Sequence, residues 1–136
     1  PIGPIVGCPP LGEALIATGF SYLPQRRAWQ ARRLLGVVPV VRDIRRFGSA
    51  ALDLCWVAAG RVDGYYEWGL QPWDLAAGAV IATEAGAEVG ALDDDTVICA
   101  APGLIGPLRD LLNAAGTDYS AEPDPAADQP KKTSAT

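Results

Sequence analysis

The chain has 136 residues, of which 49% are hydrophobic and 20% are charged, and its formal net charge is −5 at pH 7. This balance is typical of one soluble globular domain with a core of its own. No apolar run approaches the roughly 20 residues that a membrane-spanning helix requires, so we expect no membrane partner. Three cysteines without metal-ligand spacing, and no histidine, favour a reduced, cytoplasmic compartment.

Basic residues are concentrated in one part of the chain. Seven of the eleven Lys and Arg residues lie between Arg26 and Arg46, where only Asp43 opposes them. Such a cluster could meet phosphate groups or nucleic acid, or it could be a solvated helix face followed by an edge strand. Because no aromatic interleaving suggests a base-stacking surface, we expect no nucleic-acid partner.

The first half of the chain predicts alternating strands and helices. The expected elements are a strand at 13–18, a helix at 25–35, a strand at 42–47 and a helix that starts at Gly48 and Ser49 and is closed by Gly60. In the first helix, Trp29 and either Leu34 or Leu35 are expected inward. In the second, the i, i+3, i+4, i+7 spacing selects an inward face made of Ala51, Leu52, Cys55, Trp56 and Ala59.

The second half continues the same alternation. The expected elements are a strand at 64–69, a helix at 75–85, strands at Val89 and 97–100 around an acidic turn, and a helix at about 104–115 with Ile105, Leu108, Leu111 and Leu112 inward. Pro72 is expected to break the chain, and Asp74 to cap the helix that follows. The alternation predicts an α/β fold, a layered sheet flanked by helices, over residues 1–116. Residues 117–136 are expected to be a disordered tail.

Two helix starts could carry chemistry. At Gly48, Ser49 and Ala50, unpaired backbone N–H groups and a hydroxyl could receive a phosphate or a sugar hydroxyl. The alternative is an ordinary turn with a serine N-cap. Asp74 offers the carboxylate oxygens that Mg²⁺ prefers, or it is only an N-cap. Since one carboxylate cannot build a magnesium site, further ligands would have to come from elsewhere.

Glu67 lies between Tyr66 and Trp68, seven residues before Asp74. If its strand and the following helix share an edge, Glu67 and Asp74 could line one cleft. A carboxylate there could accept hydrogen bonds from substrate hydroxyls. The alternative is an exposed glutamate on a strand.

Three segments, in order, resemble the inositol monophosphatase family of magnesium-dependent sugar-phosphate phosphatases. Residues 45–55 resemble the family's arginine-x-glycine-[serine/threonine]-alanine-alanine segment, residues 57–67 its next helix and strand, and residues 73–86 its C-terminal signature. The likeness covers about residues 11–115. It implies a fold equivalent to the C-terminal half of the sugar-phosphatase fold.

The resemblance also implies roles for individual residues. Asp74 matches the family's aspartate ligand of catalytic Mg²⁺, and Glu67 matches a glutamate that hydrogen-bonds inositol hydroxyls. Gly48, Ser49 and Ala50 match the segment that meets the substrate. In the family the metal binds the phosphate ester and activates the attacking water, so the implied cofactor is Mg²⁺ and the implied partner is a small phosphate ester. The complete enzyme is expected to be a homodimer.

One part of the family pattern is missing. The aspartate-proline-[isoleucine/leucine]-aspartate-glycine-threonine motif and an earlier glutamate, which supply most metal ligands and help to activate water, are not in this sequence. The sequence therefore predicts half of a phosphomonoesterase for inositol monophosphate or a similar polyol phosphate. We expect it to be inactive alone, with no catalytic residue assigned on this chain and with an apolar face exposed where the other half would pack.

Two alternatives stay open. One is a relative that acts on histidinol phosphate, fructose bisphosphate or a phosphoadenosine nucleotide. The other is a catalytically inactive module that binds a ligand or a partner.

Overall fold

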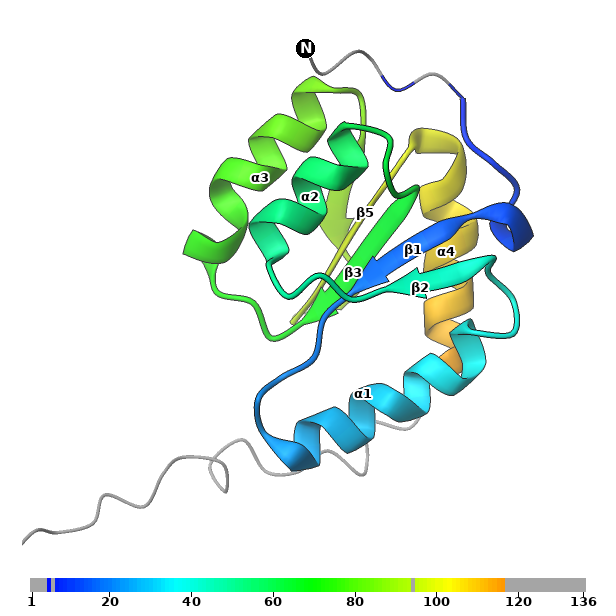
Figure 1. Cartoon of the computed structure of the whole chain (residues 1–136), viewed down its shortest axis with the longest axis vertical. Helices are drawn as coiled ribbons and strands as arrows, with labels where there is room; N and C mark the ends of the chain where they lie inside the picture. The colour runs from blue at the N-terminus through cyan, green and yellow to red at the C-terminus, as the bar shows by residue number, and fades with distance from the viewer. Residues whose placement is uncertain (1–4, 6, 94, 117–136) are drawn as a thin grey trace, which may run out of the picture.

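A five-stranded mixed sheet with helices on both faces forms the described part of the chain (Figure 1). The computed structural model describes residue 5, residues 7–93 and residues 95–116. The strands are β1 (Leu15–Thr18), β2 (Asp43–Arg45), β3 (Gly64–Trp68), β4 (Glu88–Ala91) and β5 (Thr96–Ala100). The helices are α1 (Pro24–Val37), α2 (Ala50–Ala58), α3 (Pro72–Glu84) and α4 (Pro102–Ala115), with a 3₁₀ turn at Leu11–Glu13. The predicted α/β fold, a layered sheet flanked by helices, is confirmed.

The strand order is β2-β1-β3-β5-β4. The first three of these strands are parallel, with Ile16 beside Ile44 of β2 and Gly64 of β3. β5 runs antiparallel to β3, and β4 antiparallel to β5. The carboxyl ends of β2, β1 and β3 therefore meet at one edge of the sheet, which is the usual place for a ligand crevice in α/β proteins.

The core is divided by the sheet into two apolar clusters. Figure 1 shows α2 and α3 side by side over one face and α4 behind the other. The α4 side holds Ile16, Ile98, Leu104, Leu108 and Leu112, together with Val37 from the end of α1. The other side holds Ala17, Leu54, Val57, Tyr65 and Ala82. The inward face expected for the last helix is confirmed, since Ile105, Leu108 and Leu112 are buried and Leu111 packs against the same cluster.

The face expected for α2 is wrong. Leu52, expected inward, is 52% exposed, whereas the buried residues of this helix are Asp53, Leu54, Val57 and Ala58. The helix is apolar on nearly every side, so two faces fit the same spacing. The one that contains the charged Asp53 is the one that packs on the sheet.

The N-cap position expected for Asp74 is also wrong. The helix α3 starts at Pro72, one turn earlier than expected, and Gln71 is its N-cap. Proline suits this first position because its fixed φ is helical and its missing N–H would have no partner there. Asp74 is the third helical residue, and its carboxylate accepts a hydrogen bond from the Gln71 backbone N–H at 3.0 Å, as in a capping box.

Smaller differences concern element ends. The first strand starts at Leu15, because Glu13 belongs to the 3₁₀ turn, and the second covers Asp43–Arg45 alone. In α1, Trp29 is buried as expected, and Leu34 is half-buried, while Leu35 is 77% exposed. The expected division into residues 1–116 and a disordered tail at 117–136 stays a prediction, since the tail lies outside the described residues.

Several large apolar side chains lie on the surface, among them Tyr22, Phe47, Leu52 and Trp73. The expectation that an N-terminal half of the enzyme covers these side chains stays a prediction. Within the described ranges, every helix is too short or too polar to cross a membrane.

The close contact between α2 and α3 depends on Gly78. A Cβ at this position would lie 2.8 Å from Leu54 Cδ1, 2.9 Å from Leu54 Cβ and 3.3 Å from the Ala51 carbonyl oxygen. The small residues of this segment therefore admit another helix rather than a ligand. Since the Leu54 Cβ is fixed to its backbone, any added atom must move α2 itself.

We expect Gly78→Ala to lower the free energy of unfolding by about 1–3 kcal/mol, as overpacking does. This loss should appear although alanine favours helices over glycine by about 1 kcal/mol. Urea denaturation measures the free energy of unfolding of Gly78→Ala. The matched control is Ala77→Gly, which changes an exposed residue in the same turn and therefore reports helix propensity without the helix contact. If Gly78→Ala were instead to raise stability, the two helices would not be in contact at this point.

Candidate functional site

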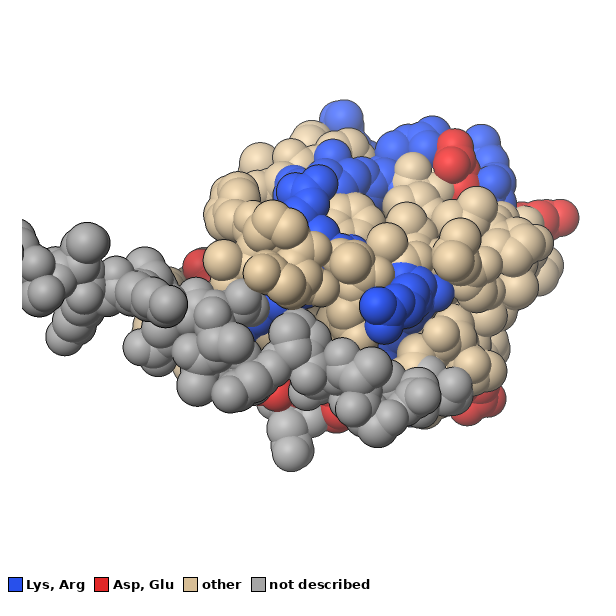
Figure 2. All heavy atoms as spheres, turned by 90° about the horizontal axis from the view of Figure 1, so that it is seen from below, with Lys and Arg blue, Asp and Glu red and all other residues tan. Residues whose placement is uncertain are grey.

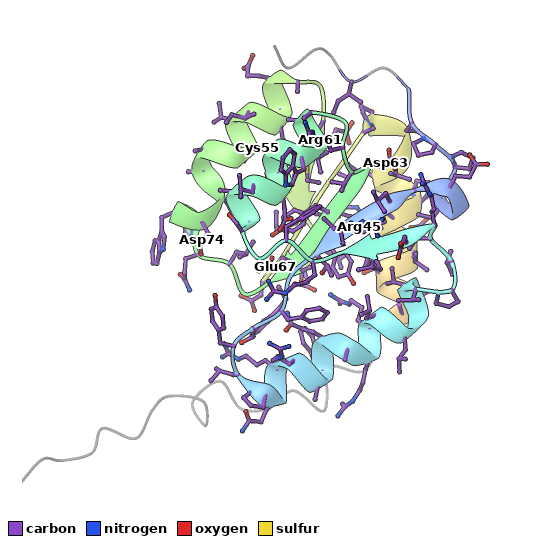
Figure 3. All side chains as sticks on the ribbon, viewed as in Figure 1. Arg45, Cys55, Arg61, Asp63, Glu67 and Asp74 are labelled. Atoms are coloured by element: carbon purple, nitrogen blue, oxygen red, sulfur yellow. The ribbon has the colours of Figure 1, made fainter. Side chains whose placement is uncertain are left out.

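A pocket of about 440 Å³ lies at the carboxyl edge of the three parallel strands. It is lined by Gly19, Phe20, Tyr22, Arg46, Gly48, Ser49, Ala50, Ala51, Glu67, Leu70, Trp73 and Asp74. All five residues proposed from the sequence, Gly48, Ser49, Ala50, Glu67 and Asp74, are among them. The structure thus brings together residues from the end of β3 and the starts of α2 and α3, and Figure 3 shows Glu67 and Asp74 on this side of the molecule.

The topology explains this convergence. Because β1 and β3 are parallel neighbours with Thr18 beside Tyr66, the next residues, Gly19 and Glu67, also lie close together. Arg46 follows directly after β2, the third parallel strand, and Gly48 and Ser49 lead into α2. The condition set by the sequence, that the strand of Glu67 and the helix of Asp74 share one cleft, is met.

Glu67 is held from two sides. The buried Tyr65 hydroxyl donates a hydrogen bond to Glu67 Oε1 at 2.9 Å. On the other side the carboxylate lies against the backbone of Gly19, so that a Cβ there would overlap it. The alternative of an ordinary exposed glutamate therefore does not describe this side chain, which is half-buried.

Burial raises the pKa of Glu67 above the ordinary carboxyl value, and the nearby charge of Asp74 acts in the same direction. The Tyr65 hydrogen bond and the positive charge of Arg46 oppose this rise. Glu67 is thus a carboxylate in a partly desolvated wall of the pocket. A hydrogen bond from a ligand hydroxyl to such a group is stronger than one to an exposed carboxylate.

The start of α2 has the geometry of an ordinary capped helix. The Ser49 hydroxyl oxygen accepts a hydrogen bond from the Leu52 backbone N–H at 3.3 Å. Gly48 has φ of 88°, in the region that favours glycine. The structural alternative considered for this segment is present, and the same residues also face the pocket.

Asp74 can supply one oxygen ligand for a metal. It lines the pocket at the positive end of α3, and carboxylate oxygens are the ligands that Mg²⁺ prefers. Within the described ranges, however, no three His, Cys, Asp or Glu residues come together as a metal-binding group would require. The residues described here therefore fit Mg²⁺ in kind but supply fewer ligands than a site needs.

Sequence reasoning missed Arg46 and Gly19 as parts of the pocket. Arg46 places a positive charge among the carboxylates, and its Nη1 would lie 2.8 Å from a Cβ at Gly48. The available signal was its place two residues before Gly48, within the basic cluster. For Gly19 the signal was its place at the end of a strand, which is where α/β proteins form ligand crevices.

The other arginines of the basic cluster lie against aromatic rings, form ion pairs with Asp43 or Asp93, or face solvent. Figure 2 views the molecule from the side of α1 and shows Arg side chains gathered on this face, with few acidic ones. The Arg26 guanidinium lies 4.7 Å from the centre of the Trp68 ring, and that of Arg27 lies 6.0 Å from Phe20. Arg33 differs from the expected solvated helix face, because it is buried and its Nη2 lies 3.9 Å from Asp93 Oδ2.

Comparisons with known proteins give matches over most of the chain. A model described as "Inositol monophosphatase family" matches residues 2–123. The inositol-1-monophosphatase SuhB of Mycobacterium tuberculosis is 51% identical over 127 residues, which cover 88% of this chain and 42% of the relative. A protein of Vibrio cholerae named Nus factor SuhB is 51% identical over 80 residues, which cover 58% of this chain and 30% of that protein.

The fold of solved relatives agrees. The structure of Mycobacterium tuberculosis SuhB superimposes with a TM-score of 0.75 at 53% identity, over 82% of this chain and 45% of that one. This chain therefore spans less than half the length of the Mycobacterium tuberculosis relative and of its solved structure.

Proposed function

Since the chain belongs to the inositol monophosphatase family, we propose that it forms the substrate-binding portion of a magnesium-dependent phosphomonoesterase for inositol monophosphate or a similar polyol phosphate. The observation that carries this proposal is that Gly48, Ser49, Ala50, Glu67 and Asp74 all line the same pocket. These residues come from two helix starts and one strand end, and the resemblance gives each of them a role toward the substrate or the metal.

The division of roles follows from the chemistry of each group. Glu67, fixed by Tyr65 and Gly19, accepts hydrogen bonds from hydroxyl groups of the polyol. Asp74 holds Mg²⁺ through a carboxylate oxygen, and the backbone around Ser49 faces the same bound molecule. When bound, Mg²⁺ supplies charge stabilisation for the phosphate ester and lowers the pKa of a bound water.

The remaining ligands would come from residues outside this sequence. The chain covers 42% of the Mycobacterium tuberculosis relative. Asp74 and Glu67 are the only two acidic side chains that line the pocket among the described residues. We infer that this chain alone does not release phosphate, and that it does so when combined with an N-terminal half from the family. The complete enzyme is proposed to be a homodimer that acts in the cytoplasm, in keeping with the free thiols of Cys8, Cys55 and Cys99.

The test is Mg²⁺-dependent phosphate release from inositol 1-phosphate, by the chain alone and by the chain mixed with an N-terminal half. In the mixture we expect activity, and we expect Asp74→Asn to lower it by more than the roughly 10–100-fold that loss of an outer-shell metal partner costs. The matched control is Asp110→Asn, which changes an exposed aspartate on α4, behind the opposite face of the sheet.

Each other outcome has a definite meaning. Activity of the chain alone that Asp74→Asn abolishes would contradict the incomplete metal site. Equal activity of the Asp74→Asn and Asp110→Asn mixtures would remove Asp74 from the metal site. A panel of histidinol phosphate, fructose bisphosphate and a phosphoadenosine nucleotide in the same mixture decides between the polyol and the other substrates of the superfamily.

A second candidate function is a module that binds a partner without catalysis. It is favoured by the name of the Vibrio cholerae relative, a Nus factor, which is 51% identical to this chain over the matched residues. If the mixture folds and binds Mg²⁺ but releases no phosphate from any of the four substrates, this second function is preferred.

A further inference from the structure

Asp53 is a buried carboxylate that the pocket residues do not account for. It lies in the first turn of α2, and its exposed fraction is 0%. Neither of its oxygens has a hydrogen-bond partner among the described residues. An ionised carboxylate in such a place costs several kcal/mol unless a partner or a proton neutralises it.

The charged and polar groups that interact electrostatically with Asp53 are those that hold the pocket wall. On β3, Tyr65 and Glu67 project to the same side of the sheet, because side chains alternate along a strand. Both interact electrostatically with Asp53, as does Arg46 from the segment before α2. The Tyr65 hydroxyl is already used in its bond to Glu67 Oε1, so it has no second proton for Asp53.

Two carboxylates in one partly desolvated cluster do not ionise together, since each charge opposes the other. Burial, followed by the charge of Glu67, raises the pKa of Asp53 to about 7, and Arg46 only partly offsets this. Glu67 has what Asp53 lacks: a donated hydrogen bond and contact with the open pocket. The proton of the pair therefore belongs on Asp53.

We propose that Asp53 is a positioning residue that carries a proton beneath the pocket and thereby leaves Glu67 as the charged carboxylate of the wall. If Asp53 lost this proton, its charge would favour protonation of Glu67 and weaken Glu67 as an acceptor. The consequence for substrate hydroxyls rests on the proposed function. The placement of the proton on Asp53 does not rest on the proposed function, so the placement and the proposed function can fail separately.

The first test uses ¹³C NMR of the side-chain carboxyl groups in the folded chain, titrated from pH 3 to 9. We expect the Asp53 carbon to titrate near pH 7 and Glu67 to titrate below it. We also expect a second, smaller inflection of Glu67 near pH 7, which reports the ionisation of its neighbour. In Asp53→Asn this second inflection should disappear while the main step of Glu67 remains. A wild-type Asp53 that titrates at an ordinary carboxyl pH, or a Glu67 without the second inflection, would overturn the proposal.

The second test compares urea midpoints of wild type and Asp53→Asn from pH 4 to 8. A group whose folded pKa lies above its unfolded value binds its proton more tightly when folded, so the wild type loses stability from about pH 4 to about pH 7. The amide of the Asp53→Asn variant has nearly the same shape as the carboxyl group but does not titrate, so the variant lacks this pH-dependent loss of stability. The midpoint of the variant relative to wild type should therefore rise over this range and level off above pH 7.

The matched control for this test is Asp43→Asn. The hydrogen bond from Arg45 lowers the pKa of Asp43, so its contribution is present above its unfolded pKa and is lost only in acid. Its midpoint difference from wild type should stay flat between pH 5 and 8. A flat midpoint difference between Asp53→Asn and wild type over the same range would also overturn the proposal. If the Asp53→Asn variant fails to fold, the NMR titration of the wild type still tests the proposal.

Discussion

Leu108→Ala is expected to lower the free energy of unfolding by about 2–5 kcal/mol, because it removes a large side chain from the centre of the core. Leu108 is fully buried in the cluster between α4 and the sheet, with Ile16, Ile98 and Leu104. Its Cδ2 would lie 3.0 Å from a Cβ at Gly64, so the side chain lies directly against the backbone of β3. A domain of this size is stable by about 5–15 kcal/mol, and the expected loss is a large part of that.

Urea denaturation of the chain measures this loss, and Leu35→Ala is the matched control. Leu35 also lies on a helix, but it is 77% exposed, so its truncation should change stability by less than about 0.5 kcal/mol. If both variants lost the same small amount, α4 would not be packed on the sheet as described. A much larger loss for Leu35→Ala would mean that α1 is covered by a second molecule in solution.

The contrast between α4 and α2 shows what a hydrophobic pattern can predict. In α4 the apolar residues Ile105, Leu108 and Leu112 form one stripe, so the buried face follows from helical spacing alone. In α2 apolar residues surround the helix, and the pattern leaves two faces open. The choice depends on tertiary contacts, above all on Gly78 of α3, which receives the Leu54 side chain.

The meeting of the candidate residues in one pocket was more predictable than the buried face of that helix. The five residues were selected because they stand at two helix starts and on one strand and match segments of a known family, and all five line one pocket. Gly19 was not selected, because its part in the pocket depends on the parallel pairing of β1 with β3, which joins residues 48 positions apart. Asp53 was not selected either, since a pattern that places charged residues outward has no place for a buried, proton-bearing aspartate.

Gly19→Ala is expected to lower kcat/KM of the assembled enzyme by about 10–100-fold with little loss of stability. A Cβ at Gly19 would overlap the Glu67 carboxylate, which is the mobile end of a side chain and can move away. The fold therefore tolerates the methyl group, but Glu67 leaves its position beside Tyr65. A hydrogen bond to a charged group contributes about 1.5–3 kcal/mol, which converts to this range of rates.

The displacement of Glu67 can be measured without catalysis. Burial raises the pKa of Glu67, so a carboxylate pushed toward solvent by Gly19→Ala should titrate closer to its ordinary value in ¹³C NMR of the chain alone. Gly12→Ala is the control, because a Cβ there meets only the Val40 carbonyl oxygen, at an ordinary 3.6 Å. A lowered Glu67 pKa with unchanged kcat/KM would show that Glu67 moves but does not bind the substrate. An unchanged pKa would mean that Gly19 does not hold the carboxylate in place. If the Glu67 pKa and kcat/KM both fall in Gly19→Ala, then Gly19, at the end of β1, positions Glu67 for the polyol.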